Sequence, residues 1–201
     1  YLIKHDLKTH YISRGKKFLK LMKFSNTYEE PFINVGNEQT KFIKEKLKLS
    51  DKIIISYGVD SREPHRMWSV EKFIELIKNI SVKFEAQHCI IASPLNQKIV
   101  LDIIGGLPNL EIYDCSQLRI KELAPLLKIS KIFIGNDSGP YNLSAAVGTT
   151  AIGINGALKP LTHSIYFRPI TPIGGDYYSP NDRPIDNSGT EIKENWIQDR
   201  I

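Results

Sequence analysis

The sequence is poor in cysteine and has no long apolar run. Only two of its 201 residues are cysteines, Cys89 and Cys115, and both lie inside apolar, strand-like segments. Such a pair excludes a disulfide scaffold and indicates buried free thiols in a reducing compartment. No apolar stretch reaches the roughly 18 residues that a transmembrane helix needs. We therefore expect no membrane-spanning segment and a cytoplasmic location.

Several sequence signatures are also missing. The chain has no Asp-x-Asp motif or His/Cys cluster with metal-ligand spacing, and no zinc-finger or RNA-binding motif. We therefore expect no bound metal and no nucleic-acid partner. The Gly-x-Gly-x-x-Gly turn of nicotinamide-dependent dehydrogenases is missing too, because Gly58 stands alone after the first expected strand.

Positive charge is concentrated in the first segment of the chain. The formal net charge is +5, and seven cationic residues lie close together there: Lys4, Lys8, Arg14, Lys16, Lys17, Lys20 and Lys23. Such a run either attracts an anionic partner or forms one solvated helix face, which is the commoner case. The chain starts at Tyr1 without Met or a signal-peptide pattern, which is typical of the interior of a longer chain.

From Lys52 onward, apolar β-rich runs alternate with helical patterns. We expect strands at 53–57, 88–92, 110–113, 132–134 and 150–154, and helices at 69–80, 95–105, 119–129 and 139–147. Ser69 is a good N-cap for the first of these helices, and Pro125 is expected to kink the third. Continuous apolar strands separated by helices indicate βαβ units. The fold class is therefore α/β, a Rossmann-like parallel sheet of about five strands with helices on both faces.

Ligands of such sheets bind at the carboxyl ends of the strands, and one loop there is rich in chemistry. Residues 135–140 read Gly-Asn-Asp-Ser-Gly-Pro between an expected strand and helix. Gly139 would let a ligand approach the backbone, and the helix amides form an anion site suited to a diphosphate. The alternative is that Asp137 and Ser138 only cap the helix, and local chemistry alone favours neither interpretation.

The loop after the first expected strand is long for a strand-to-helix connection, and long loops are often functional. It offers Gly58 for close approach, the Ser61 hydroxyl, and Arg62 or Arg66 as a cation for phosphate. Trp68, just before the expected N-cap, is more typical of a packing anchor than of a ligand contact.

Together these segments resemble the ADP-heptose:lipopolysaccharide heptosyltransferase family, glycosyltransferase family 9. The resemblance rests on 58–61, 66–68, 135–140, the Leu-Ser-Ala-Ala of 143–146, and Gly148, in that order. It covers only the C-terminal, donor-binding half of a B-type (double-Rossmann) enzyme. It implies an acceptor-domain remnant with its linker over 1–50, a nucleotide-sugar-binding domain over 51–189 and a C-terminal helix over 190–201.

The resemblance also implies roles for individual residues. Ser61 and Arg66 would bind the diphosphate of the donor, and Arg66 stands where the family usually has Lys. The loop that would hold the diphosphate and the donor sugar contains Asp137, Ser138 and Gly139.

Further positions match the family less closely. Leu118 falls where the family has an apolar contact to the base, and Gly156 matches its glycine after the last strand. Asn142 replaces the signature His and can donate a hydrogen bond but cannot carry a proton. Asn96 or Gln97 would have to replace a Glu that binds the ribose.

The implied reaction is an inverting, metal-independent transfer from a nucleoside diphosphate sugar, ADP-heptose, to a lipid-linked or oligosaccharide acceptor of lipopolysaccharide type. It needs no cofactor beyond this donor, and such an acceptor allows peripheral contact with the inner membrane surface. The general base would come from the acceptor domain, so no catalytic residue is assigned within the chain.

Three alternatives remain open. The first is a UDP-sugar transferase or epimerase of the same fold. The second is a degenerate, non-catalytic binding module, which the Asn142 replacement makes plausible. The third and least favoured is a nicotinamide-dependent dehydrogenase.

Overall fold

The computed structural model of the chain describes residues 11–24, 32–62, 64–154 and 170–173. Its helices and strands follow one another in the order α1 Tyr11–Leu21, α2 Asn37–Leu47, β1 Ile53–Gly58, α3 Val70–Lys83, β2 Ala86–Ile91, α4 Gln97–Gly105, β3 Ile112–Asp114, α5 Ile120–Ile129, β4 Ile132–Asn136, α6 Gly139–Ala146, β5 Ala151–Ile154 and β6 Ile170–Ile173. Two short 3-10 helices, η1 Pro64–Arg66 and η2 Pro94–Asn96, lie in the connections. Within these described parts, no helix is long and apolar enough to span a membrane.

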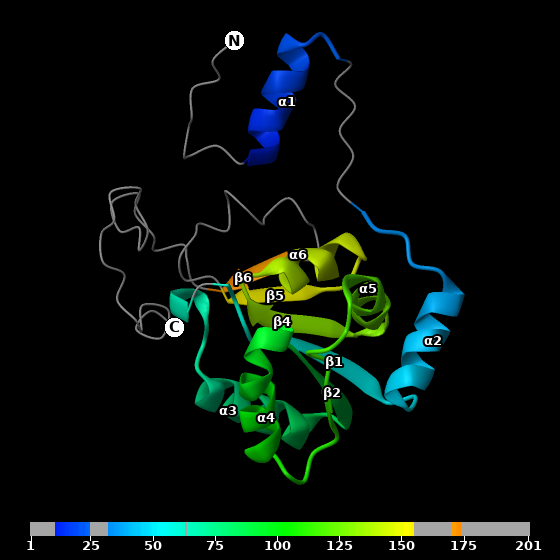
Figure 1. Cartoon of the computed structure of the whole chain (residues 1–201), viewed down its shortest axis with the longest axis vertical. Helices are drawn as coiled ribbons and strands as arrows, with labels where there is room; N and C mark the ends of the chain where they lie inside the picture. Colours follow the sequence, from blue (N-terminus) through cyan, green and yellow to red (C-terminus); the bar gives the residue numbers. More distant parts are fainter. Residues whose placement is uncertain (1–10, 25–31, 63, 155–169, 174–201) are drawn as a thin grey trace.

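The strands form one parallel sheet in the order β3-β2-β1-β4-β5-β6 (Figure 1). The expected five strands are all present, so the predicted fold class is confirmed. A sixth strand, β6, lies beside β5 and was not among the expected strands. This strand contains Pro172, which pairs with Gly153 of β5. An edge strand tolerates proline because it needs hydrogen-bond partners on one side only.

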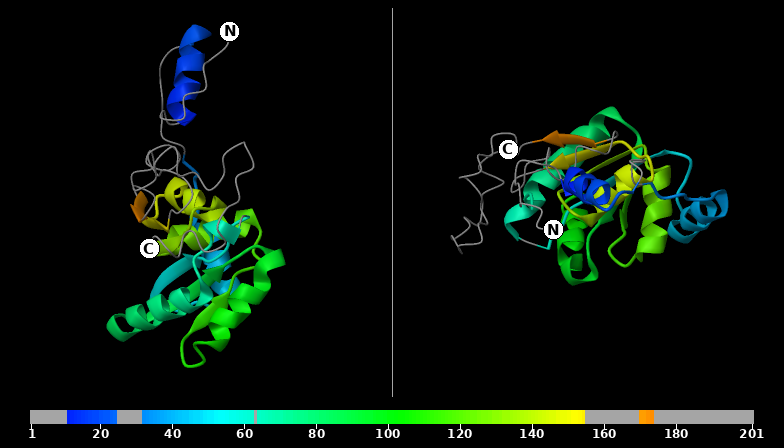
Figure 2. Two further views of the ribbon diagram at one scale, coloured as in Figure 1. Left: turned by 90° about the vertical axis from the view of Figure 1, so that its left-hand side faces the viewer. Right: turned by 90° about the horizontal axis from the view of Figure 1, so that it is seen from above.

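Alternation along the strands divides the core into two clusters, one on each face. Ile54 of β1 and Phe133 of β4 face the cluster formed with α2, α5 and α6, whereas Ile55 and Ile134 face the cluster formed with α3 and α4. This alternation with period two is what a sheet covered on both faces requires. The two views in Figure 2 show helices on both sides of the sheet.

The helix after β1 begins as the sequence predicts. The Ser69 side chain accepts a hydrogen bond from the Lys72 backbone N, which caps α3. Phe73 and Ile77 are its fully buried residues. The Trp68 ring contacts Phe73 edge-on, with 5.2 Å between the ring centroids, so its predicted role as a packing anchor is confirmed. The third predicted helix, α5, continues through Pro125.

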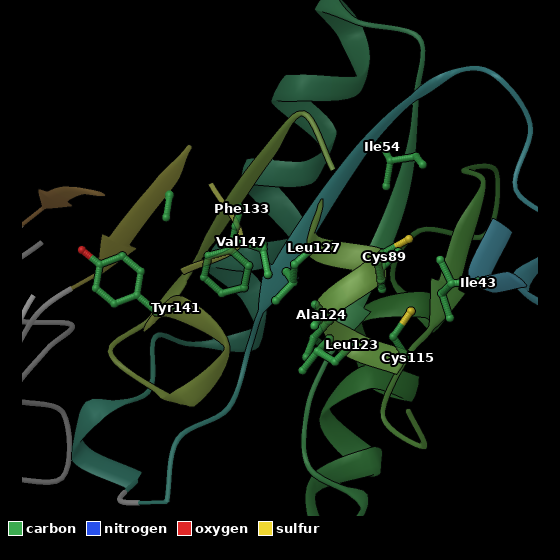
Figure 3. Close-up of a cluster of buried hydrophobic side chains, with 13 residues drawn as sticks. Ile43, Ile54, Cys89, Cys115, Leu123, Ala124, Leu127, Phe133, Tyr141 and Val147 are labelled. Carbon is green, nitrogen blue, oxygen red and sulfur yellow. The ribbon is translucent and has the colours of Figure 1, made fainter. Parts of the chain in front are cut away.

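The helix α2 belongs to the sheet layer, although the expected domain boundary at residue 50 separated it from that layer. Ile43 is fully buried in the same cluster as Cys89 and Cys115 (Figure 3). Lys46 Nζ donates a hydrogen bond of 2.7 Å to Glu122 Oε1 of α5. The apolar and ionic contacts together fix α2 on α5, and the domain boundary at residue 50 stays a prediction.

The prediction of free, buried thiols is confirmed, because both cysteines are buried and unpaired by disulfide. The hydrogen bond with Cys89 and, after it, burial raise the pKa of the Cys115 thiol well above its ordinary value. Cys115 therefore contributes to packing as a neutral thiol, with the buried Cys89 beside it.

The helix α1 lies apart from the sheet layer (Figures 1 and 2). Its apolar side chains Phe18, Leu19 and Leu21 are exposed. With its cationic residues, this makes α1 an amphipathic helix. Its assignment to an acceptor-domain remnant stays a prediction.

Candidate functional site

The strand order creates a topological switch point between β1 and β4. From β1 the chain proceeds through β2 to β3 on one side, and from β4 it proceeds through β5 to β6 on the other. The loops that leave the carboxyl ends of these two neighbouring strands diverge, and ligands of open α/β sheets bind in the resulting crevice. The two loops singled out in the sequence are the ones that border it.

An ion pair joins these loops. Arg66 Nη2 lies 3.5 Å from Asp137 Oδ2, and 21% of the Arg66 side chain and 12% of the Asp137 side chain remain exposed. A tight charge-assisted hydrogen bond measures about 2.7–2.9 Å, so this pair is loose. The sequence interpretation assigned both residues to the donor diphosphate loops and did not foresee that they pair with each other.

The N-terminus of α6 opens at the same place. Ser138 occupies the N-cap position with extended backbone, but its side chain makes no capping hydrogen bond. Its Oγ is buried and has no hydrogen-bond partner in the described part of the chain. The cap-only interpretation of Ser138 is therefore wrong, and its hydroxyl is available for another partner.

Gly139, the first residue of α6, lies beside open space. A Cβ built at this position would have no described atom within 4 Å. Packing within this part of the protein therefore does not require glycine here. Close approach of a ligand to the backbone, as expected from the sequence, stays a prediction that this geometry allows.

Gly58 has a packing reason to be glycine that was not expected. A Cβ at Gly58 would lie 2.5 Å from the Phe133 ring, and a Cβ at Gly135 would lie 2.6 Å from the Gly58 backbone oxygen. The two glycines are opposite each other in the pairing of β1 with β4. Their small size lets the two strands and the Phe133 ring pack, so Gly58 has a packing role as well, and the expected approach of a ligand stays a prediction.

Asn136, at the end of β4, was not among the candidate site residues. Its side-chain Oδ1 accepts a hydrogen bond of 3.0 Å from the Trp68 backbone N. An asparagine at the carboxyl end of an apolar strand was the signal that could have marked it, since a buried amide needs partners.

Asn142, which replaces the signature His expected from the resemblance, lies in the first turn of α6, and its side-chain amide binds the backbone at the start of that helix. The side-chain Nδ2 donates a hydrogen bond of 3.2 Å to the Ser138 backbone O. The Oδ1 atom is buried and accepts no hydrogen bond from the described residues. The amide thus stabilises the turn before α6 in this structure.

Two carboxylates bind the segment after β2, one from the loop after β1 and one from the end of β3. Asp60 Oδ2 accepts hydrogen bonds from the Ser93 backbone N at 2.7 Å and from Asn96 Nδ2 at 3.2 Å. Asp114 Oδ2 accepts one from Gln97 Nε2 at 2.9 Å. Asn96 and Gln97, the expected ribose contacts, therefore both have their donor groups bound to carboxylates of the protein.

The environment of Asp114 favours its charged form. Burial opposes ionisation, but the hydrogen bonds from Gln97 and Ser116 outweigh it, and the pKa of Asp114 lies below its ordinary value. Next to it, Ser116 Oγ is buried without a hydrogen-bond partner among the described residues. The loop after β3 thus carries a fixed negative charge and a buried hydroxyl.

The remaining expected site residues differ in their placement. Ser61 is buried in the loop after β1. Leu118 packs partly buried against the cluster on the α5 face, which leaves a base contact as a prediction. Gly156 lies outside the described residues.

The comparison with known protein families decides the identity of the chain. Residues 3–187 match the family model of glycosyltransferase family 9 (heptosyltransferase). The chain belongs to this family. The matched range includes both loops of the switch point, and the predicted family is therefore confirmed. No curated protein matches the sequence.

Solved structures of family 9 glycosyltransferases have a similar fold. They include the Escherichia coli ADP-heptose lps heptosyltransferase II (TM-score 0.70, 15% identity, 81% of this chain and 50% of that chain covered). A family 9 glycosyl transferase from Veillonella parvula DSM 2008 gives a TM-score of 0.72 at 16% identity, over 86% of this chain and 50% of that one. The E. coli heptosyltransferase WaaC with ADP gives 0.59 at 16% identity, over 87% of this chain and 54% of that one. The chain spans about half the length of these structures.

Proposed function

We propose that this chain is the donor-binding half of a heptosyltransferase-like glycosyltransferase, and that the crevice between β1 and β4 binds a nucleoside diphosphate sugar. ADP-heptose is the proposed donor, and a lipid-linked or oligosaccharide acceptor of lipopolysaccharide type is the proposed acceptor. The observation that carries the proposal is the N-terminus of α6, where the Ser138 side chain makes no capping hydrogen bond, next to the Arg66 guanidinium at the switch point. Membership of glycosyltransferase family 9 supports the class of donor.

The electrostatics of the crevice support a diphosphate. The N–H groups of a first helical turn point out of the N-terminus and carry the positive end of the helix dipole. In α6, Pro140 has no N–H and the Asn142 N donates to the Ser138 O at 3.4 Å, so the Gly139 amide is the one beside open space. Arg66 adds a full positive charge with several N–H donors in one plane, which suits phosphate oxygens. At 3.5 Å the Arg66–Asp137 pair is longer than a tight charge-assisted hydrogen bond, so turning the guanidinium toward a phosphate gives up only a weak contact with Asp137.

Each residue has a distinct part in the proposed mechanism. As the bond between the sugar and the diphosphate breaks, negative charge grows on the leaving phosphate, and Arg66 and the α6 amides stabilise it. The Ser138 hydroxyl donates to a phosphate oxygen. Asp137 cannot favour the phosphates, so we assign its carboxylate to accept hydrogen bonds from hydroxyls of the donor sugar.

The transfer is proposed to be inverting, independent of a metal ion and of any cofactor beyond the donor. No residue of the chain is assigned as the general base, which we expect from an acceptor domain in the whole protein. We also propose a cytoplasmic location, with peripheral contact at the inner membrane surface where a lipid-linked acceptor would lie.

A nucleotide-binding module without transferase activity is the second candidate. The position of Asn142 favours it, because this amide is engaged with the Ser138 backbone O and cannot carry a proton. This candidate predicts the same nucleotide binding but no sugar transfer by the whole protein.

Calorimetric titration of the chain with ADP, UDP and GDP in the presence of EDTA tests the proposal. We expect ADP to bind with the highest affinity and Arg66→Ala to weaken it about 10- to 100-fold, as expected for loss of hydrogen bonds to a charged group. Lys131→Ala is the matched control, because this exposed lysine precedes β4 at the amino ends of the strands, away from the crevice.

The outcomes separate the alternatives. Preference for UDP would contradict the proposed donor and favour the UDP-sugar alternative. Equal losses in the Arg66 and Lys131 variants would contradict the proposed location of the site. Binding of ADP without sugar transfer by the whole protein would favour the non-catalytic module.

A further inference from the structure

Asn136 links the two loops that border the crevice. It is the last residue of β4, it is fully buried, and its Oδ1 accepts the hydrogen bond from the Trp68 backbone N. The next residue, Asp137, pairs with Arg66, which lies two positions before Trp68. The loop after β1 is therefore tied twice to the end of β4, once by a buried hydrogen bond and once by the ion pair.

The same side chain is only half satisfied. Asn136 Nδ2 is buried and has no hydrogen-bond partner in the described residues, and the same holds for Trp68 Nε1. A buried amide with an unpaired N–H group destabilises the folded state relative to an apolar side chain of similar size. Buried polar groups that violate local packing rules in this way are found preferentially at functional sites. The asparagine therefore needs an explanation beyond packing.

We propose that Asn136 is a positioning residue of the nucleotide site. By holding the Trp68 amide, it fixes the end of the loop that carries Arg66 at the correct distance from the N-terminus of α6. The inference rests on the proposed function, since it assigns Asn136 to the same crevice. It does not require Asn136 to touch the ligand.

The geometry explains why one hydrogen bond has this effect. Trp68 packs against Phe73 at the start of α3, so the loop after β1 is anchored at its far end by the Trp68 ring and backbone together. Without the Asn136 acceptor, the Trp68 amide loses its partner, and the segment bearing Arg66 loses the buried one of its two ties to the end of β4. Phosphate binding between two loops depends on their separation, because sub-ångström errors weaken preorganised contacts.

The test compares Asn136→Ala with Thr149→Val. Thr149 also makes a buried hydrogen bond, from its Oγ1 to the Leu127 backbone O at 2.6 Å, but it lies just before β5 at the opposite edge of the sheet. Valine keeps the shape of threonine and removes only that bond. Both variants therefore lose one buried hydrogen bond, and only one of them loses it at the crevice.

Two measurements are made on both variants of the 201-residue chain. The first is hydrogen exchange without nucleotide. We expect faster exchange of the amides of 65–68, above all that of Trp68, in Asn136→Ala and unchanged exchange there in Thr149→Val. The second is titration with ADP, where we expect Asn136→Ala to weaken binding about 10-fold and Thr149→Val less than about 2-fold, given the value of one buried hydrogen bond.

Asn136→Asp separates positioning from general stability. Its carboxylate can still accept a hydrogen bond from the Trp68 N, so the amides of 65–68 should stay protected from hydrogen exchange. Its negative charge should weaken ADP binding at pH 7.5. Lowering the pH protonates the carboxyl into a neutral group that resembles the amide. Affinity for ADP should then recover toward that of the unaltered chain measured at the same pH.

Unchanged hydrogen exchange of the amides of 65–68 in Asn136→Ala would overturn the inference. Equal losses of ADP affinity in Asn136→Ala and Thr149→Val would overturn it too. If the unaltered chain bound no nucleotide, the proposed function would fail. The exchange measurement would still decide by itself whether Asn136 fixes the loop.

Discussion

Arg66 Nη2 lies 3.5 Å from Asp137 Oδ2 across the switch point between β1 and β4. The pair brings together a cation that follows the first strand and a carboxylate that follows the fourth. It places a cation that suits phosphate beside an anion that suits sugar hydroxyls. A donor that carries both groups would find both partners within one crevice.

Replacing Asp137 with Asn should affect ADP and ADP-sugar in opposite ways. The change removes a partly buried negative charge near the proposed phosphates and weakens its competition for Arg66, so we expect ADP to bind about 3- to 10-fold more tightly. An ADP-sugar should lose its advantage over ADP, because the amide is a weaker acceptor for sugar hydroxyls. Competition titrations with both ligands measure the difference. Weaker ADP binding with an unchanged preference for the sugar would contradict the assigned role.

The two glycines of the site should respond differently to alanine. Gly58→Ala places a Cβ 2.5 Å from the Phe133 ring, and we expect a loss of about 1–3 kcal/mol in the free energy of unfolding from overpacking. Gly139→Ala meets open space among the described atoms and replaces a helical glycine, so its stability should be unchanged or slightly higher. Thermal unfolding with and without ADP distinguishes them. Stabilisation by ADP should shrink in Gly139→Ala, and an undiminished effect would show that no ligand approaches that backbone.

The buried His88 should make the fold less stable in mild acid. The Ser81 hydroxyl donates to the Ile77 O, so its oxygen accepts from His88 Nε2, and Nδ1 is left to accept from the Tyr57 hydroxyl. Burial lowers the pKa of His88, and the Glu111 charge only partly offsets this.

The unfolded chain therefore takes up the proton first. Stability from the neutral His88 is complete above about pH 6.5, the ordinary histidine value, and decreases as the pH falls below it. The melting temperature of the unaltered chain should fall between pH 7.5 and 5.0, and the slope should be shallower in His88→Gln. Parallel slopes in both proteins would contradict this assignment.

The contact between α2 and α5 should also weaken in acid, but at a lower pH than the contribution of His88. Hydrogen bonds from the Arg119 side chain, from Lys46 and from the Arg119 backbone N lower the pKa of Glu122 to about 2. Its contribution is complete above the ordinary glutamate value and is lost as the pH falls toward 2. Glu122→Gln should therefore lower the melting temperature at pH 7 and differ less from the unaltered chain near pH 3.

A matched control for this contact is Asp102→Asn, which removes the exposed pair of Lys98 with Asp102 within α4. Exposed pairs of this kind contribute little, so this variant should melt close to the unaltered chain at both pH values. A loss as large as that of Glu122→Gln would show that the buried setting of Glu122 has no special effect.

The fold was largely predictable from the sequence because its strands are continuous apolar runs. Ile53–Gly58 and Ile132–Asn136 differ from the expected strands only at their carboxyl ends. The edge strand β6 could not be predicted, because four residues that include Pro172 carry no strand pattern of their own. The membership of α2 in the sheet layer depends on Ile43 reaching the core across α5, which no local pattern reveals.

The candidate site was predictable by residue type but not by contact. The motif of 135–140 marked the correct end of β4, because Gly and Pro positions around a helix start have local causes. The pairing of Arg66 with Asp137 and the bond from Trp68 to Asn136 join segments far apart in the chain. Such contacts follow from strand order, and one sequence does not reveal whether β1 neighbours β4. The packing role of Gly58 could not be predicted for the same reason, since the Phe133 ring beside it comes from the neighbouring strand.

The most direct test of the central claim is an NMR titration of the isotope-labelled chain with ADP in EDTA, followed through the backbone amide resonances. The account predicts the largest shifts at Ser138, Gly139 and Asn142 and in the loop that carries Arg66, with little change at Lys131 and Thr149 at the opposite edge of the sheet. Shifts confined to that opposite edge, or none at millimolar ADP, would contradict the assignment of a nucleotide site to the crevice between β1 and β4.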